Sequence, residues 1–379
     1  MSDLTDQGRL PTAQKAARWL SFPRLVLAVA TAGVLVGGGL VGHQWLTSPS
    51  RAGSAQTWFA SYVDVTANPT VDFATPTANS RRDVVLSFVV SAPDGPCTPT
   101  WGTALTLDQA SAGLDLDRKI ATLEQHGGGL AVSFGGLLND ELATTCQDVD
   151  KLAAAYTEVM DRYHCSTIDL DLESGNLSDR AARLRRAQAI KKLQLARRAS
   201  GKSLAVWLTL PVSPSGLTQD GQAAVAEMLS AGVDLAGVNA MAMDYSGSGT
   251  DSHSMLVTTT NALSAVQRQL GTLYGRAGTK LSSATVWSKL GVTPMIGQND
   301  VPGEVFSLNS AKGLNEFVLS HSLGRVSMWS LNRDKTCGPN YVDVKRASDA
   351  CSGVSQGNQK FADLLASGFT GRLSLAAGK

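Results

Sequence analysis

The sequence predicts an α/β protein, a (β/α)8 TIM barrel that is preceded by one apolar N-terminal helix. Between residues 57 and 330, eight short apolar runs alternate with segments of helical spacing. Several of these runs are almost continuously apolar, as expected for parallel strands that are covered on both faces. The conspicuous polar residues follow the ends of the runs, which is where parallel barrels gather their catalytic groups.

An uncharged N-terminal segment comes before the barrel. Residues 1–24 are polar and include basic side chains, and residues 25–42 form an 18-residue run without a charge. A run of this length is just sufficient for a membrane helix, and its basic flank predicts a cytoplasmic N-terminus. We therefore expect a cytoplasmic segment over 1–24, a transmembrane anchor or signal sequence over 25–46 and a linker over 47–56. The rest would lie on the extracellular side, or be secreted if the helix is cleaved.

The predicted catalytic barrel covers residues 57–351, and residues 352–379 form a C-terminal tail that either packs as a final helix or frays. The expected strands are 57–65, 84–90, 130–134, 166–173, 204–210, 238–243, 292–296 and 325–330. The expected helices are 107–126, 148–163, one that begins at Ser178, 219–231, 261–273 and 309–320. A net charge of +1 offers no field for nucleic acid. We expect a monomer.

The five cysteines lack the spacing of a metal site. No metal and no cofactor is therefore expected. For an exported chain, the easiest disulfide joins Cys337 to Cys351, and Cys97 with Cys146 is the next pairing. Cys165 would remain as a free, buried thiol, although the sequence by itself does not fix the connectivity.

The most informative stretch is the predicted fourth strand, residues 166–173. Side chains alternate along a strand, so Asp169, Asp171 and Glu173 would share one inward face. Three neighbouring carboxylates repel one another and are costly to bury, so a structural role alone explains them poorly. Crowding raises the pKa of a carboxyl, which suits an acid that must keep its proton near neutral pH. Glu173, the last in the row, is the natural proton donor.

This run resembles the Asp-x-x-Asp-x-Asp-x-Glu signature of glycoside hydrolase family 18, the chitinases and their relatives. Ser166 stands in place of the first Asp. Three further runs are similar to the family: 133–136 resembles the Ser-x-Gly-Gly after the third strand, 241–245 the Met-x-Tyr-Asp after the sixth, and 326–330 the eighth strand with its Trp. Residues 59–64, 293–297 and 329–334 look like a microbial subgroup similar to archaeal and actinobacterial chitinase catalytic domains.

The resemblance implies a glycosidase that cleaves β-1,4 linkages between N-acetylglucosamine units in chitin or chitooligosaccharides. The mechanism would be retaining and assisted by the 2-acetamido group of the substrate. Glu173 would serve as general acid and base, Asp171 would orient the acetamido group, and Asp169 would share a proton with Asp171. Asp244 would bond near the acetamido group, and Trp329 would form the apolar floor.

Other residues are candidates for substrate binding. Ser133 and Gly136 would leave room beside the acids, and Met243 stands where many family members have Tyr. Tyr245 points outward if the strand alternates normally, and Gln298 follows the seventh strand. Two alternatives stay open: a non-hydrolytic, lectin-like protein that binds chitooligosaccharides, and an endo-β-N-acetylglucosaminidase that acts on other glycans.

Overall fold

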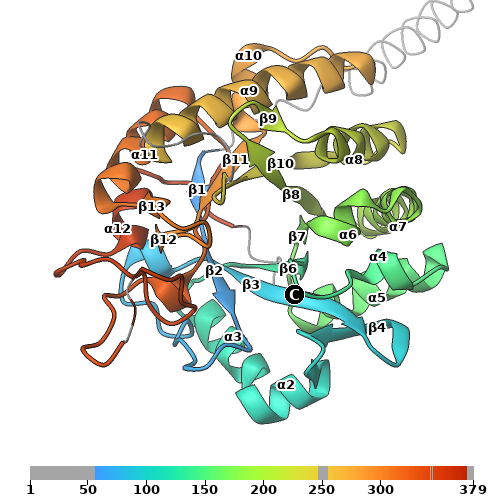
Figure 1. The fold of residues 1–379 in the computed structure, drawn as a ribbon. Coiled ribbons are helices and arrows are strands. Elements are labelled where there is room, and N and C mark those ends of the chain that lie inside the picture. The colour runs from blue at the N-terminus through green and yellow to red at the C-terminus, as the bar shows by residue number, and fades with distance from the viewer. Residues whose placement is uncertain (1–55, 246–254, 342, 344, 374–379) are drawn as a thin grey trace, which may run out of the picture. The chain divides into compact units, whose positions relative to one another are not determined.

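The computed structural model describes residues 56–245, 255–341, 343 and 345–373 (Figure 1). The predicted segments 1–24 and 25–46, and all of the linker except its last residue, lie outside these residues. Within the described ranges, no helix has both the length and the apolar character needed to cross a membrane. The predicted anchor therefore stays a prediction.

Eight parallel strand positions form a closed barrel. The first position is divided at Ala60 into β1 and β2; β1 pairs with β14, and β2 pairs with β3, so the first and last strands meet. Every predicted strand is present. The barrel strands are β1 (Trp58–Phe59), β2 (Ser61–Asp64), β3 (Val84–Ala92), β6 (Leu130–Gly135), β7 (Thr167–Asp171), β8 (Ala205–Ser213), β10 (Leu235–Ala242), β11 (Leu290–Pro294) and β14 (Arg325–Val326).

Helices surround the strands on the outside of the barrel (Figure 1). They pack through apolar faces against the outer side of the sheet, where the larger core lies. The helices are α2 (Leu107–Leu114), α3 (Leu116–Gln125), α4 (Leu142–Thr145), α5 (Val149–Arg162), α6 (Ser174–Ser178), α7 (Arg180–Ala199), α8 (Gln219–Ser230), α9 (Met255–Arg276), α10 (Ser283–Ser288), α11 (Leu308–His321) and α12 (Phe361–Leu365), with short 3-10 turns η1 (Asn79–Arg81) and η3 (Leu331–Arg333).

Three helix predictions were wrong in their boundaries. The helix predicted over 261–273 is longer in the structure, where α9 covers Met255–Arg276. The segment 107–126 is not one helix, because Asp115 adopts a left-handed conformation with φ 57° and ends α2 before α3 begins. The helix predicted from Ser178 begins instead after Asp179, whose carboxylate caps the amides of Ala181 and Ala182. The short α6 that precedes it was not predicted.

Five short strands lie outside the eight barrel positions, in segments that connect the main elements of the described chain. They are β4 (Gly95–Trp101), β5 (Leu105–Thr106), β9 (Gly216–Leu217), β12 (Gly297–Gln298) and β13 (Val305–Phe306). Residues 352–373 pack on the barrel: α12 buries Phe361 and Leu365, and Arg372 forms an ion pair with Asp83. The final-helix alternative for the tail is therefore confirmed for residues 361–365.

The predicted disulfides are both confirmed. Cys97 is bonded to Cys146, and Cys337 to Cys351. Cys165 is a free, buried thiol.

Candidate active site

The acidic row lies at the carboxyl end of β7. Asp169 and Asp171 belong to the strand, and Glu173 follows in an extended conformation, φ −128° and ψ 162°, just before α6. The alternation therefore continues past the last paired residue and keeps the three carboxyls on the inner side, whereas Leu170 and Leu172 are fully buried in the outer core.

A cavity of about 460 Å³ opens above this row, at the carboxyl ends of the strands. Side chains from most barrel strands and from the loops that follow them line it, so it occupies the usual position of a barrel active site. The lining residues are Tyr62, Asp64, Thr66, Phe88, Gly102, Gly135, Leu137, Leu138, Asn139, Asp171, Glu173, Thr209, Met241, Met243, Asp244, Thr293, Met295, Asp300, Trp329 and Asp349.

Asp169 lies beneath the cavity and is completely buried. Its carboxylate accepts four hydrogen bonds, from Tyr62 Oη (2.7 Å), Ser133 Oγ (2.7 Å), Thr209 Oγ1 (2.6 Å) and Arg325 Nη1 (2.5 Å). Burial raises the pKa of Tyr62, so its hydroxyl keeps the proton that it donates. The four donors are groups other than Asp171, and the proton sharing between Asp169 and Asp171 stays a prediction.

Arg325 supplies the countercharge. Its guanidinium lies inside the barrel, 5.1 Å from the ring centre of Trp58 and 5.5 Å from that of Trp207, and it also donates to Tyr62 Oη (3.0 Å). Aromatic faces and a buried carboxylate stabilise the cation in this apolar interior. Asp169 and Arg325 therefore form a buried ion pair that lies beneath Asp171 and Glu173.

The carboxyl groups of Asp171 and Glu173 are joined by a hydrogen bond. Burial raises the pKa of Asp171, and the charges of Glu173 and Asp169 raise it further. Burial also raises the pKa of Glu173, to about 7, and the neighbouring Asp244 and Asp300 add to this shift. The pair therefore retains at least one proton near neutral pH. One oxygen of Asp171, Oδ1, is buried without a hydrogen-bond partner among the described residues.

Asp244 follows β10 and lines the same cavity as Glu173. Its Oδ1 accepts hydrogen bonds from the backbone amides of Asp300 (2.9 Å) and Val301 (3.1 Å), which fixes the loop that follows β12. Partial burial raises the pKa of Asp244. Asp244 therefore holds the loop at Asp300 and Val301 against the cavity that contains Glu173.

Three aromatic side chains form the apolar side of the cavity. The rings of Phe88 and Trp329 stack with their centres 5.5 Å apart and their planes at 19°. Tyr62 contacts both rings. Flat aromatic surfaces of this kind suit the C–H face of a sugar ring.

The predicted site residues divide into those that line the cavity, those directly below it and those outside it. Asp171, Glu173, Met243, Asp244 and Trp329 line the cavity together. Asp169 and Ser133 lie directly below it and bond to each other.

Gly136, Tyr245 and Gln298 do not line the cavity. A Cβ on Gly136 would lie 2.9 Å from the Phe88 ring, so this glycine allows the close approach of an aromatic side chain. Tyr245 turns outward, as strand alternation predicted, and its hydroxyl donates to Thr259 (3.3 Å). Gln298 bonds through its backbone to Ser352 and Arg333.

Several cavity residues were not predicted as site residues. Phe88 lies in the predicted strand 84–90, and Asp300 follows the predicted seventh strand, which places it on the active face by topology. Asp349 had no signal, and Tyr62 lies in a run that carried the resemblance but was not singled out. The inward alternation of β2 would have indicated Tyr62, since Phe59, Ser61 and Val63 occupy the other face. The position of Arg325 inside the barrel could not be predicted, because no pattern near it in the sequence indicates that its side chain points inward.

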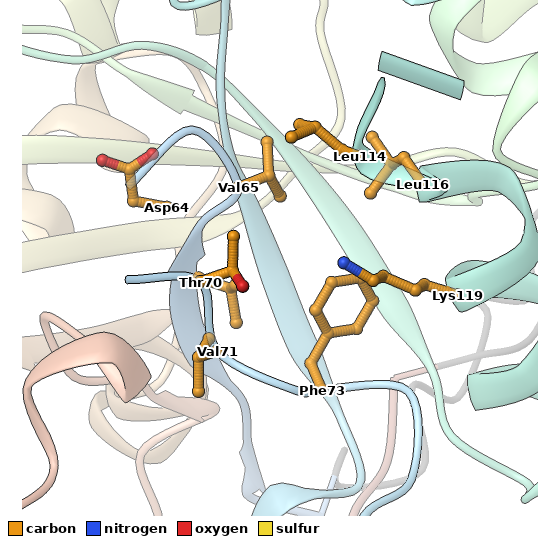
Figure 2. Close-up of a pocket in the computed structure, with 9 residues that line it drawn as sticks. Asp64, Val65, Thr70, Val71, Phe73, Leu114, Leu116 and Lys119 are labelled. Carbon is orange, nitrogen blue, oxygen red and sulfur yellow. The ribbon is translucent and has the colours of Figure 1, made fainter. Parts of the chain in front are cut away.

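A second, much smaller crevice lies beside β2, where Val65, Phe73, Leu114 and Leu116 converge (Figure 2). Its free volume of about 10 Å³ is close to that of a single water molecule. It cannot hold a sugar, so the candidate active site is the larger cavity.

Comparison with known proteins gives curated relatives and structural neighbours, while no protein-family model matches the chain. The chain is 35% identical over 310 residues to a probable bifunctional chitinase/lysozyme of Escherichia coli (strain K12), covering 78% of this chain and 33% of that protein. It is 33% identical over 304 residues to endochitinase 11 of Metarhizium anisopliae, covering 76% and 56%. The chain thus spans between a third and a little over half of these relatives.

The fold is shared with the catalytic domain of the hyperthermophilic chitinase from Pyrococcus furiosus, with TM-score 0.68, 24% identity, and coverage of 82% of this chain and 96% of that one. Catalytic domain 2 of the Group II chitinase of Ostrinia furnacalis matches with TM-score 0.52, 12% identity, and coverage of 82% and 96%. Both curated relatives are chitinases by name, and the fold is that of these chitinase catalytic domains. They confirm the resemblance that the motifs predicted: the chain is a relative of the family 18 chitinases.

Proposed function

We propose that this protein hydrolyses β-1,4 linkages between N-acetylglucosamine units, with the acetamido group of the substrate taking part in the reaction. The observation that carries the proposal is the pair Asp171 and Glu173. A buried Asp171 oxygen, which has no hydrogen-bond partner in the described part of the chain, lies beside an acid of pKa about 7. A buried acceptor of this kind needs a donor. The N–H of a 2-acetamido group supplies one.

In the first step, protonated Glu173 gives its proton to the glycosidic oxygen, and the bond from that oxygen to C1 breaks. The acetamido carbonyl oxygen bonds to C1, and a cyclic oxazolinium ion forms. Asp171 accepts the hydrogen bond of the acetamido N–H and stabilises the positive charge. Burial and the charges of Asp244 and Asp300 favour the protonated form of Glu173 before the reaction.

In the second step, the Glu173 carboxylate takes a proton from water, and the water oxygen attacks C1. The bond between C1 and the acetamido oxygen breaks. Two displacements at C1 leave its configuration retained. Asp169 stays in its ion pair with Arg325 beneath the reacting groups and is not a reactant in either step.

The charge of the cavity favours neutral amino sugars over acidic glycans. Six carboxyl side chains are among its lining residues, from Asp64, Asp171, Glu173, Asp244, Asp300 and Asp349, and none of the lining residues is basic. A carboxylate on the substrate, as in peptidoglycan, would be repelled there. We therefore propose chitin or chitooligosaccharides as the substrate rather than a polymer that contains muramic acid.

The test is product release from N-acetyl-chitooligosaccharides by the purified protein and its Glu173→Gln variant. We expect turnover to fall by at least about a hundredfold in the variant, while oligosaccharide binding persists, because Gln cannot donate a proton. Turnover that survives the substitution would contradict the role of Glu173. Binding without turnover in the wild type would favour the lectin-like alternative, and cleavage of N-glycans instead of chitooligosaccharides the endo-β-N-acetylglucosaminidase.

We also propose that the enzyme acts outside the cytoplasm. Two disulfides in one chain are typical of proteins that fold in oxidising compartments. Whether residues 25–46 anchor the protein to the membrane or are cleaved is decided by N-terminal sequencing of the mature protein and by its partition between membrane and medium.

A further inference from the structure

Two neighbouring leucines stand exposed at the edge of the cavity. Leu137 is 58% exposed and Leu138 is 87% exposed, the highest values among the large apolar side chains of the described residues. Both line the same cavity as Asp171 and Glu173. Isolated apolar side chains on a surface are common, but an adjacent pair at the mouth of a binding cavity indicates a contact surface.

The backbone on either side of these leucines is firmly held. Gly136 N donates to Asp171 O (3.0 Å), and Ser91 N donates to Asp140 O (2.9 Å). The side chain of Asn176, on α6, donates to Asn139 O (2.7 Å) and accepts from Glu141 N (2.9 Å).

Behind the loop lies a buried ion pair. Glu141 and Arg186 are both fully buried, with Nη2 2.6 Å from Oε2, and the hydroxyl of Tyr156 also bonds to Glu141. Removal of either charge would leave the other unpaired in the interior, so the end of this loop is strongly fixed. The leucines are therefore exposed because the loop is held in this conformation.

We infer that Leu137 and Leu138 bind the apolar face of a sugar unit adjacent to the reacting one and thereby favour longer chains. The inference rests on the proposed function. The cavity continues from the acids to the leucines, so a chain seated at Glu173 extends toward them. The C–H groups of a pyranose ring would cover the leucine side chains, and water would leave both surfaces.

The test compares kcat/KM for the N-acetylglucosamine hexasaccharide with kcat/KM for a fluorogenic disaccharide glycoside. The variant is Leu137→Ser/Leu138→Ser, and the matched control is Leu195→Ser, a 50% exposed leucine on the outer helix α7. We expect the ratio of the two constants to fall about tenfold in the double variant, given the apolar area that two leucines present. The control should keep the ratio of the wild type.

An unchanged ratio in the double variant would overturn the inference, as would an equal loss of the ratio in the control. If the wild type cleaves neither substrate, the proposed function fails, and calorimetric titration with the hexasaccharide decides the inference separately. Binding about tenfold weaker in the double variant alone would then support the leucine contact. Equal affinities, or no binding by the wild type, would overturn it.

Discussion

The surroundings of Glu173 raise the pKa of its carboxyl group. Its pKa is about 7, because partial burial disfavours the charged form and because Asp244 and Asp300 repel a further negative charge; the hydrogen bond to Asp171 acts in the opposite direction. An acid with this pKa is about half protonated at neutral pH, and its conjugate base is strong enough to activate water.

Activity should therefore depend on the protonation of Glu173. We expect kcat/KM to fall above about pH 7, by about tenfold for each further pH unit, as the acid loses its proton. Asp300→Asn removes one of the charges that raise the pKa, so the midpoint of this fall should move to lower pH. The measurement is a pH profile of kcat/KM for the wild type and the variant.

Asp94→Asn serves as the control, since Asp94 is exposed and does not line the cavity. Its midpoint should equal that of the wild type. A midpoint that stays fixed in Asp300→Asn would show that Asp300 does not act on Glu173.

Sequence reasoning reached the acids and several of their neighbours, such as Asp244 and Trp329, but not the buried partner of Asp169. The period of two in residues 169–173 places three carboxyls on one face, and this is a local property of a strand. The partner of Asp169 is Arg325, 156 positions away, and only closure of the barrel brings β14 to β7. The proton shared by Asp171 and Glu173 likewise depends on burial, which no local pattern specifies.

At the scale of elements, the contact between β6 and β7 depends on a glycine. Gly135 pairs with Asp171 in the sheet and has φ 108°. A Cβ there would overlap the carbonyl oxygen of Asp171, so an L-residue would have to push the two strands apart.

Gly135→Ala should therefore destabilise the protein by about 1–3 kcal/mol and reduce turnover, because the strained backbone carries Asp171. Gly113→Ala is the matched control: this glycine lies in α2, and no atom stands within 4 Å of its added Cβ. The control should be neutral or slightly stabilising. Denaturant unfolding and kcat of both variants check the prediction, and equal behaviour would contradict it.

The elements themselves were largely predictable, because strands and helices follow the period of their apolar residues. The break at Asp115 was not, since an isolated left-handed residue leaves the helical spacing on either side intact. The short α6 was also missed: five residues are too few to show a period.

At the scale of the whole molecule, two disulfides fasten loops of different length. The Cys97–Cys146 bond spans 49 residues and the Cys337–Cys351 bond spans 14. A longer loop loses more freedom in the unfolded chain when it is closed.

Replacing both cysteines of a pair by Ser should cost about 4 kcal/mol for Cys97 with Cys146 and about 3 kcal/mol for Cys337 with Cys351. Unfolding of the two double variants in denaturant, beside the wild type, gives the two differences. A larger loss from the shorter loop would show that native contacts near Cys351, rather than chain entropy, dominate.

The free thiol of Cys165 bears on how these disulfides form. Burial raises its pKa to about 12, so in the folded barrel almost none of it is thiolate, the form that attacks a disulfide. During oxidative folding the fifth cysteine competes for partners only while it is still accessible. Once the barrel has closed over Cys165, this thiol is no longer available to exchange with either disulfide.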